Sequence, residues 1–349
     1  MKLALDAMGG DNAPQINIDG AKLALQEVKG LETIYLVGRE EELRPLCAAA
    51  GILDNPRVEL VHASEVVGMG ESGKAVRQKK DSSMCRAVEL VRRGQADAVL
   101  SAGNTGAAVT ASTLLLGRLP GVKFPGIVSP LPSVHGHVLL TDTGANPDAE
   151  PKNLVVYGIF AAMMVRYIYN RPAPKVGIMS NGTEEGKGCA KSKETFKLMS
   201  ALAAKGILPF EFIGNCEGHD IFETELDAAV MDGFTGNILL KTAEATVKAF
   251  THWMKAGIKS SVPAMAGALL MKGVFSRLNA RLNPDKIGGS TLMGVNGVSI
   301  IAHGSANGEA ILNAIRMAEA MCRHSVNDKI IAALERVNPA IAELESEQS

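Results

Sequence analysis

Apolar and polar positions along the chain repeat one unit: a short strand-like apolar run, a loop rich in Gly, Asn, Ser or Asp, and an Ala/Leu-rich helical stretch. Strands that alternate with helices predict a mostly parallel sheet covered by helices on both faces. In such a sheet every strand-to-helix loop leaves at the carboxyl edge, so we expect these loops to converge on one rim. The runs and their loops lie at 3–5 and 6–12, 98–100 and 101–106, 138–140 and 141–147, 176–179 and 180–188, 228–231 and 232–237, and 298–302 and 303–308.

A rim of this kind is suited to binding an anion. Each following helix offers unpaired N–H groups and the positive end of its dipole. Glycines let the backbone approach a ligand closely, and Asn, Ser and Thr add neutral donors. Gly, Asn and Ser also make ordinary turns. Six loops at the same kind of junction nevertheless favour a ligand site over unrelated turns.

Composition narrows the class of protein. The 349 residues are enough for two domains, or for one large α/β domain with insertions, and a net charge of −1 gives no basic footprint for nucleic acid. The five cysteines are widely spaced without a C-x-x-C pair, which indicates a reducing compartment and no disulfide framework. The stretch 1–6 already contains an acidic residue, Asp6, and is too short an apolar start for a signal peptide. The longest apolar run, 154–165, is shorter than a bilayer-spanning helix, which needs about 20 residues. We therefore expect a cytosolic protein.

The segment 68–74 matches G-x-G-x-x-G and nearly matches a phosphate-binding P-loop. Ala75 stands where a P-loop needs a magnesium-binding Ser or Thr, so that interpretation fails on its own chemistry. A dinucleotide site would need an acidic residue about 20 positions further on, at a strand end, whereas Glu89 lies in a helical pattern. A flexible surface loop is the better interpretation.

Three other features admit more than one interpretation. His135 and His137 could be metal ligands, but they have no partner at helical spacing, and we interpret them as structural. Cys189 could be an activated nucleophile at a helix start, although a free cysteine usually fills a core. The stretch 264–281 is first apolar all round and then alternates bulky apolar with basic residues. It could form a core helix, a dimer contact or an exposed hairpin tip that touches a membrane.

Several loops together resemble the PlsX family of phosphate acyltransferases, which convert acyl-[acyl carrier protein] and inorganic phosphate to acyl phosphate. The likeness runs from residue 1 to about 320. The residues at 124–126, 179–182 and 288–294 depart from the family's usual pattern, which bears on acyl-chain preference and loop mobility rather than on the reaction. The matching motifs lie at 6–11, 80–84, 101–107, 144–146, 187–188, 232–237 and 303–305.

The resemblance implies the isocitrate/isopropylmalate dehydrogenase type of α/β fold, with two domains around a cleft. We expect one domain from 1–120 plus 286–349 and the other from 121–285, the second carrying dimerisation and a possible membrane-touching segment at 260–283. It also implies a homodimer. The protein would bind the inner membrane surface peripherally and pass its product to a membrane glycerol-phosphate acyltransferase. From the residues themselves we expect no cofactor and no metal.

The candidate site residues are taken from these motifs. None of them is assigned as a nucleophile, because phosphate is itself a competent nucleophile. We assign phosphate to the loops at Gly9, Gly10, Ser101, Asn104, Thr105, Asn146 and Ser305, with Lys187 as the cationic partner. Asn237 and His303 are candidates for carbonyl polarisation or proton transfer, and Asp232 for the base. Each Asn or Asp could equally be a turn or cap residue.

Two points stay open. The carrier protein is acidic, and its docking face could involve Lys79, Lys80 and Arg86, or else Arg92 and Arg93. The competing functions are a nicotinamide-dependent oxidoreductase of the same fold, and a non-catalytic adaptor that binds acyl phosphate or carrier protein. Against the oxidoreductase, the sequence shows no clear acidic residue to bind the adenine ribose and no series of aspartates to bind a metal.

Overall fold

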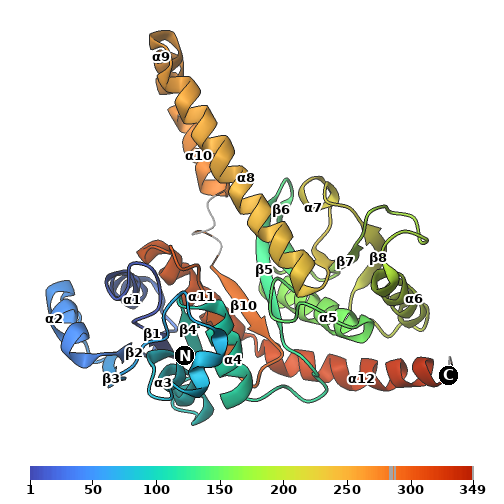
Figure 1. Ribbon diagram of the computed structural model, residues 1–349, viewed down its shortest axis with the longest axis horizontal. Helices are drawn as coiled ribbons and strands as arrows, with labels where there is room; N and C mark the ends of the chain where they lie inside the picture. Colours follow the sequence, from blue (N-terminus) through green and yellow to red (C-terminus); the bar gives the residue numbers. More distant parts are fainter. Residues whose placement is uncertain (283–285, 287, 348–349) are drawn as a thin grey trace.

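The computed structural model describes residues 1–282, 286 and 288–347, so the predicted boundaries at 283 and 285 lie outside the described residues (Figure 1). Its strands form a single sheet. They are β1 (Lys2–Asp6), β2 (Thr33–Gly38), β3 (Val58–His62), β4 (Ala98–Ser101), β5 (Gly126–Ser133), β6 (Gly136–Thr141), β7 (Lys175–Met179), β8 (Glu211–Cys216), β9 (Ala228–Val230), β10 (Ser290–Met293) and β11 (Val298–Ile301).

Helices follow most strands, as the repeating unit predicts. Those between β1 and β7 are α1 (Gln15–Glu27), α2 (Glu40–Ala50), the 3₁₀ turn η1 (Gly73–Arg77), α3 (Ser83–Arg92), α4 (Thr105–Leu115) and α5 (Pro151–Tyr167). The later ones are α6 (Ala190–Ala204), α7 (Asp220–Glu223), α8 (Gly233–Lys259), α9 (Val262–Leu270), α10 (Lys272–Leu282), α11 (Gly308–Arg323) and α12 (Val326–Glu347).

The sheet has the strand order β3-β2-β1-β4-β11-β10-β5-β6-β9-β7-β8. The strands from β3 to β11 in this order are parallel to one another, and so are the strands from β6 to β8. Between the two groups, β11 with β10, β10 with β5, and β5 with β6 all pair antiparallel. The second group therefore runs opposite to the first, and the expectation of a single rim for all six loops is wrong.

The loops still meet, because the two groups are staggered. Thr141 at the end of β6 pairs with Val128, which pairs with Thr291, which pairs with Ile300, one residue before β11 ends. β4 ends level with β11. The carboxyl ends of the two groups thus approach each other from opposite directions and meet near the middle of the sheet.

Helices cover both faces of the sheet, as predicted. One face packs against α1, α11, α5 and α12, and the other packs against α3 and α4 in the first group and α7 and α8 in the second. The apolar run 154–165 lies in α5, which is buried all round between the sheet and helices α6 and α12. A helix that is apolar on every side belongs in such an interior position.

The two strand groups suggest a working division of the chain. The strands of 1–120 and 286–349 form one half of the sheet, and those of 121–285 form the other half. The end of the chain crosses this division: α12 packs against α5 and α6, where Lys205 Nζ lies 3.2 Å from Glu343 Oε2. The two-domain boundaries stay a proposal.

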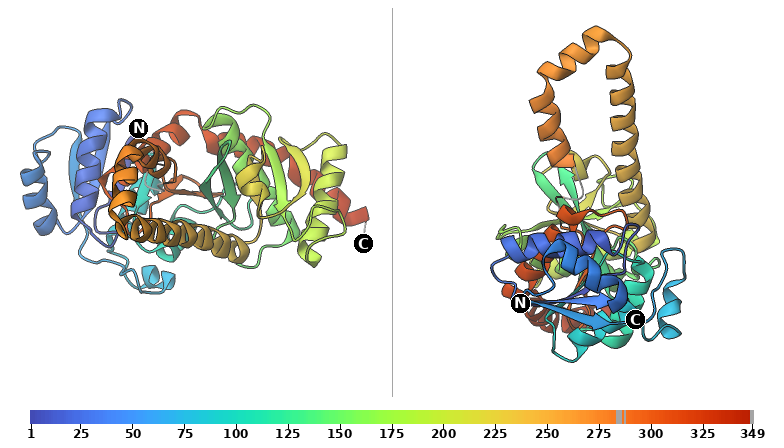
Figure 2. Two further views of the ribbon diagram at one scale, coloured as in Figure 1. Left: turned by 90° about the horizontal axis from the view of Figure 1, so that it is seen from above. Right: turned by 90° about the vertical axis from the view of Figure 1, so that its left-hand side faces the viewer.

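A helical arm stands away from the body, built from the end of α8 together with α9 and α10 (Figures 1 and 2). Within α8, Gly233 and Gly236 are the buried positions, and α9 has no buried residue. The interpretation of 264–281 as a core helix is therefore wrong, and an exposed hairpin is confirmed. Among the described residues, no helix combines the length and apolar character needed to cross a membrane.

Candidate active site

Asp6, at the end of β1, organises the loops that follow β1 and β4. Its buried carboxylate accepts a hydrogen bond from the Ser101 hydroxyl at 2.7 Å, and Ser101 Oγ accepts one from the Gly103 amide at 2.9 Å. Burial raises the pKa of Asp6. A Cβ atom at Gly9 would lie 2.7 Å from the Gly103 nitrogen and 2.8 Å from Ser101 Oγ, so the loops can pack this closely only with glycine there. Gly9 and Ser101, both predicted phosphate ligands, form the support of the site.

Gly10 joins this support to the loop after β11. Its φ of +117° suits glycine, and the next residue, Asp11, donates its amide hydrogen to the Gly304 carbonyl at 2.8 Å. The loops after β1, β4 and β11 are thus one connected unit at the carboxyl ends of the first strand group.

Asn104 caps α4 and holds the glycine-rich loop at 68–73. Its Oδ1 accepts from the Ala107 amide at 2.9 Å, while Nδ2 donates to the carbonyl oxygens of Met69 at 3.0 Å and Glu71 at 2.7 Å. Because both polar atoms are occupied, Asn104 acts here as a cap and a loop anchor. The following residue, Thr105, lines the cavity described below.

Asp142 performs for the second strand group what Asp6 does for the first. It is buried after β6 and accepts hydrogen bonds from the amides of Ile127 at 2.8 Å, Gly144 and Ala145 at 3.0 Å and Asn146 at 2.6 Å. Burial raises its pKa, and these hydrogen bonds act in the opposite direction. The sequence motif points to Gly144 and Asn146, but Asp142 is the residue that shapes this loop.

The first turns of α8 dock directly on the Asp142 loop. Asp232 is the N-cap of α8 and accepts from the Thr235 amide at 2.7 Å, which matches the cap interpretation rather than that of a free base. The Gly233 amide donates to the Asn146 carbonyl at 3.0 Å. The Asn146 side chain itself donates to the Tyr157 hydroxyl at 3.1 Å.

A small cavity of about 140 Å³ lies where the two strand groups meet. Two helix N-termini border it, because Thr105 begins α4 and Ala310 lies in the first turn of α11, while α8 lines it with one side from its second turn onward, at Asn237, Leu240, Lys241 and Glu244. The two helices of the first strand group therefore direct the positive ends of their dipoles toward this space. Since a water molecule takes about 30 Å³, the cavity holds about four or five water-sized groups, which suits a tetrahedral oxyanion.

Hydroxyl groups line one side of this cavity. Ser129 Oγ lies 2.7 Å from Thr143 Oγ1 and 2.7 Å from Ser290 Oγ. Ser129 and Ser290 stand on the central strands β5 and β10, whose mutual antiparallel pairing brings them together. These neutral donors suit an oxyanion ligand.

A cation, a carboxylate and an imidazole line the opposite side. Lys241 and Glu244 follow Asn237 at one-turn intervals on α8, and Lys241 Nζ lies 3.1 Å from Glu244 Oε2. His303 Nε2 lies 4.0 Å from the same carboxylate oxygen. The Ser305 amide donates to His303 Nδ1 at 3.2 Å, which places the imidazole proton on Nε2 and points an N–H toward the cavity side.

A larger and mostly apolar cavity of about 540 Å³ adjoins the first. Pro130, Leu240, Glu244 and His303 border both cavities and form their common wall. The larger cavity continues between β5 and α8 toward the base of the arm. Its further lining comes from Leu131, Pro132, Phe222, Leu239, Thr242, Ala243, Thr246, Val247, Lys248, Leu282 and Ser305.

The structure divides the predicted site residues into three sets. Thr105, Asn237 and His303 line the small cavity, and Ser305 orients His303. The supporting or capping residues are Gly9, Gly10, Ser101, Asn104, Asn146 and Asp232. Lys187 lies apart, on the loop after β7, where its amide donates to the Glu184 carbonyl at 3.0 Å.

Sequence reasoning missed the hydroxyl groups of Ser129 and Ser290 and the charged pair Lys241 and Glu244 on α8. Ser129 and Ser290 lie in strands that the pattern does not predict, so no signal pointed to them. Lys241 and Glu244 could have been found, because they repeat at helical spacing from Asn237.

The rejected motifs have structural roles. The loop at 68–73 leads into η1 rather than from a strand into an α-helix, which is the context a dinucleotide site requires. His135 Nε2 lies 3.2 Å from the Glu223 carbonyl, and the His137 ring lies 6.0 Å from that of Tyr169. No cluster of three or more potential metal ligands occurs in the described part of the chain.

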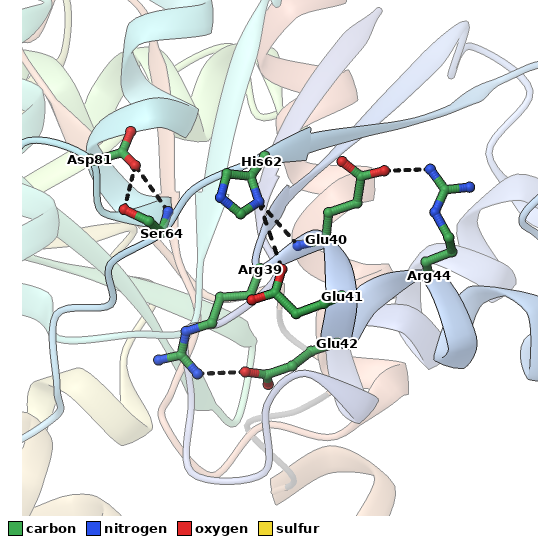
Figure 3. Close-up of polar contacts among 8 residues, drawn as sticks. All are labelled: Arg39, Glu40, Glu41, Glu42, Arg44, His62, Ser64 and Asp81. Carbon is green, nitrogen blue, oxygen red and sulfur yellow. Dashed lines mark hydrogen bonds and ion pairs between the residues drawn. The ribbon is translucent and has the colours of Figure 1, made fainter.

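Two further groups of reactive or charged side chains lie away from these cavities. Cys189 is the exposed N-cap of α6, and hydrogen bonding with Ser192 lowers the pKa of its thiol. It is absent from the lining of both cavities described above. At the start of α2 the Glu41 carboxylate lies 3.9 Å from His62 Nδ1, while Glu40 and Glu42 pair with Arg44 and Arg39, so these carboxylates do not converge (Figure 3).

Known proteins give an independent comparison. The family model described as "Fatty acid synthesis protein" matches residues 1–329. A phosphate acyltransferase of Akkermansia muciniphila is 54% identical over 347 residues, which cover 99% of each chain. A phosphate acyltransferase of Acidobacterium capsulatum is 42% identical over 331 residues, covering 95% of this chain and 96% of the relative.

Solved structures of low sequence identity share the fold. A phosphotransacetylase from Streptococcus pyogenes has a TM-score of 0.62 at 18% identity, covering 93% of this chain and 94% of its own. The EutD phosphotransacetylase from Staphylococcus aureus has a TM-score of 0.59 at 16% identity, covering 92% and 94%. The predicted α/β fold class, which phosphotransacetylases share, is confirmed.

Proposed function

Because this chain belongs to the PlsX family of phosphate acyltransferases, we propose that it transfers a fatty acyl group from acyl-[acyl carrier protein] to inorganic phosphate. The products are acyl phosphate and the free thiol of the carrier protein. Acyl phosphate would then serve a membrane glycerol-phosphate acyltransferase in phospholipid synthesis.

The observation that carries this proposal is the pair of adjoining cavities with a common wall. The small cavity offers hydroxyls, helix N-termini and Lys241, which suit phosphate, and the large apolar cavity suits a fatty acyl chain. A carbonyl at the boundary between them would lie beside His303 and within reach of a phosphate oxygen. This arrangement matches the two reactants of an acyl transfer to phosphate.

The reaction then needs no covalent bond to the protein. A phosphate oxygen forms a bond to the thioester carbonyl carbon, and the carbon–sulfur bond of the resulting tetrahedral intermediate breaks. The proton of hydrogen phosphate passes to the departing sulfur, with His303 and Glu244 placed to relay it. Holding two reactants in line can supply about 7–11 kcal/mol of the barrier in well-oriented cases. An N–H at His303 Nε2 directed at the developing oxyanion would add about 3 kcal/mol.

The direct test incubates the protein with acyl-[acyl carrier protein] and radiolabelled phosphate. Labelled acyl phosphate should form and be convertible to an acyl hydroxamate by hydroxylamine. Thioester loss without phosphate would indicate a hydrolase, and binding without turnover would indicate the non-catalytic adaptor. Either result would refute the proposed reaction.

We also propose that the protein works as a homodimer at the inner face of the cytoplasmic membrane. The arm supports this, because Val262, Leu269 and Leu270 expose 74%, 72% and 90% of their surface. Exposed apolar side chains of this density are typical of a surface that meets another copy or a lipid interface. Sedimentation of the protein alone tests the dimer, and co-sedimentation with anionic vesicles tests membrane binding. A protein that sediments as a monomer and does not bind the vesicles would contradict both proposals.

A further inference from the structure

The strongest charge concentration outside the cavities lies on the segment 72–93, which forms η1, α3 and the turn between them. It contains seven Lys or Arg residues and two acidic residues, a net charge of +5 in a chain whose total is −1. A local charge of this size on a nearly neutral protein indicates an anionic partner.

The two acids on this face are already used to hold arginines. Asp81 accepts hydrogen bonds from the Ser64 amide at 3.0 Å and the Ser64 hydroxyl at 2.6 Å (Figure 3) and pairs with Arg86 at 2.5 Å. Glu89 pairs with Arg92 at 2.5 Å and with Arg93 at 2.8 Å. Hydrogen bonding lowers the pKa of Asp81, chiefly through Ser64, and that of Glu89, chiefly through Arg92, each to about 2.

Of the remaining cations, Lys79 is held by the protein itself and the others are available to a partner. Lys79 is held by Glu71 at 2.7 Å and by the Val66 carbonyl at 2.8 Å. Arg77 and Lys80 are exposed, and the described part of the chain offers neither of them a hydrogen-bonding or charged partner. Lys74 on the same segment is also exposed and has no charged partner among the described residues, so the face presents three unneutralised charges beside positioned arginines.

These charges surround an apolar groove. Arg77, Lys80, Arg86 and Arg93 border a cavity of about 590 Å³ whose apolar lining comes from Val76, Ala111, Leu114 and Leu115. Leu114 is 53% exposed at this position. An apolar centre inside a charged rim is the usual anatomy of a protein–protein interface.

The groove is connected to the reaction cavity by α4. Thr105 at the start of α4 lines the small cavity, and Leu114 near its end lines the groove, nine residues or about 14 Å along the helix axis. The loop at 68–73 lies against the start of this helix, where Asn104 anchors it. A phosphopantetheine arm has a main chain equivalent to about four to five residues and therefore spans about 15–17 Å when extended. The length of such an arm matches this separation.

We propose that the groove between η1, α3 and α4 is the surface on which the acyl carrier protein docks, with an acidic face of the carrier against Arg77 and Lys80. This inference rests on the proposed function, which supplies the carrier as acyl donor. A membrane is the less suitable anionic partner, because α3 and α4 lie on the side of the body away from the arm tip at α9 (Figure 1). A concave surface also fits a small protein better than a lipid plane.

The test compares Arg77→Glu/Lys80→Glu with a matched control, Lys22→Glu/Lys29→Glu. The control makes the same charge change at exposed positions in and just after α1. Each protein is assayed with acyl-[acyl carrier protein] and with the same acyl group on free pantetheine, and binding of fluorescent holo carrier protein is measured by anisotropy. For Arg77→Glu/Lys80→Glu we expect kcat/KM with the carrier substrate to fall by about tenfold or more, mainly through KM, because close charge pairs are reversed. Activity with acyl-pantetheine should be retained, and the control should match wild type in both assays.

The outcomes separate the two proposals. Equal loss with both substrates, or unchanged carrier binding, overturns the docking surface. If Arg77→Glu/Lys80→Glu loses binding to phosphatidylglycerol vesicles but keeps normal kinetics with the carrier substrate, the groove is a membrane contact and the docking proposal is overturned. If wild type forms no acyl phosphate from either substrate, the proposed function fails, and the anisotropy comparison still decides where the carrier binds.

Discussion

Gly236 and Gly257 both lie inside α8 and offer a matched test of how tightly this helix seats on the site. A Cβ atom at Gly236 would lie 2.0 Å from the carbonyl oxygen of Asp142, whereas a Cβ at Gly257 would meet nothing within 4 Å. Replacing glycine by alanine inside a helix normally stabilises it by up to about 1 kcal/mol. Gly257→Ala should show this gain, and Gly236→Ala should not.

The expected loss at Gly236 follows from the contact. An ordinary carbon–oxygen contact is about 3.3 Å, so α8 and the Asp142 loop must separate by about 1.3 Å to accept the methyl group. Overpacking of this kind costs about 1–3 kcal/mol, which outweighs the gain in helix propensity. Asn237 and Lys241 move with the helix, and a misplacement of about 1 Å can cost about 100-fold in rate.

Urea denaturation and acyl phosphate formation measure the two consequences. We expect Gly236→Ala to lower both the midpoint of unfolding and kcat/KM, and Gly257→Ala to raise the midpoint with kcat/KM unchanged. Equal behaviour of the two variants would show that the start of α8 is not fixed against the Asp142 carbonyl, and the description of the cavity would then be wrong.

Three further predictions test other parts of the site. Lys241→Ala should raise the KM for phosphate about tenfold or more, and Lys187→Ala should raise it much less, because Lys241 lines the cavity. Initial rates at varied phosphate concentration measure both values. A larger effect of Lys187→Ala would restore Lys187 as the cationic partner of phosphate. Asn104→Ala should cost about 1 kcal/mol of stability through the lost cap and expose the loop at 68–73 to limited proteolysis; an intact loop would refute its role as anchor. Hydrogen bonding, chiefly from Ser64, holds the pKa of Asp81 at about 2, so its contribution to stability is present above the unfolded value of 3.8 and is lost as pH falls toward 2. Asp81→Asn should therefore be less stable than wild type at neutral pH, with a difference that shrinks between pH 4 and 2; a constant difference would contradict this.

The sequence was sufficient to predict the repeating strand–loop–helix unit and the fold class, but not the direction of the second strand group. The reason lies in β5 and β10, which reverse that direction. β5 contains Pro130 and Pro132, which suppress a strand prediction because proline lacks an amide hydrogen. β10 is four residues long and follows Gly288 and Gly289, so it has too little pattern to detect.

The same strands explain which site residues sequence reasoning could identify. Thr105, Asn237 and His303 follow predicted strands and were found. Ser129 and Ser290 lie on the two unpredicted strands and were not. Asn104 and Asn146 were assigned to phosphate because an amide suits it, but tertiary partners occupy their side chains, and such partners cannot be read from spacing.

Opposed strand directions are what allow the small cavity to form at all. If β6 and β9 ran parallel to β4 and β11, the helix after β9 would start at the same edge as α4 and α11 and lie beside them. Because the two groups run head-on and are staggered, α8 instead starts opposite α4 and α11, with the cavity between them. A bound phosphate would then meet donors from both sides, and the buried carboxylates of Asp6 and Asp142 are engaged by hydrogen bonds from their own loops. The antiparallel strands that hid the fold's direction from sequence reasoning are therefore the feature that gives the site two facing walls.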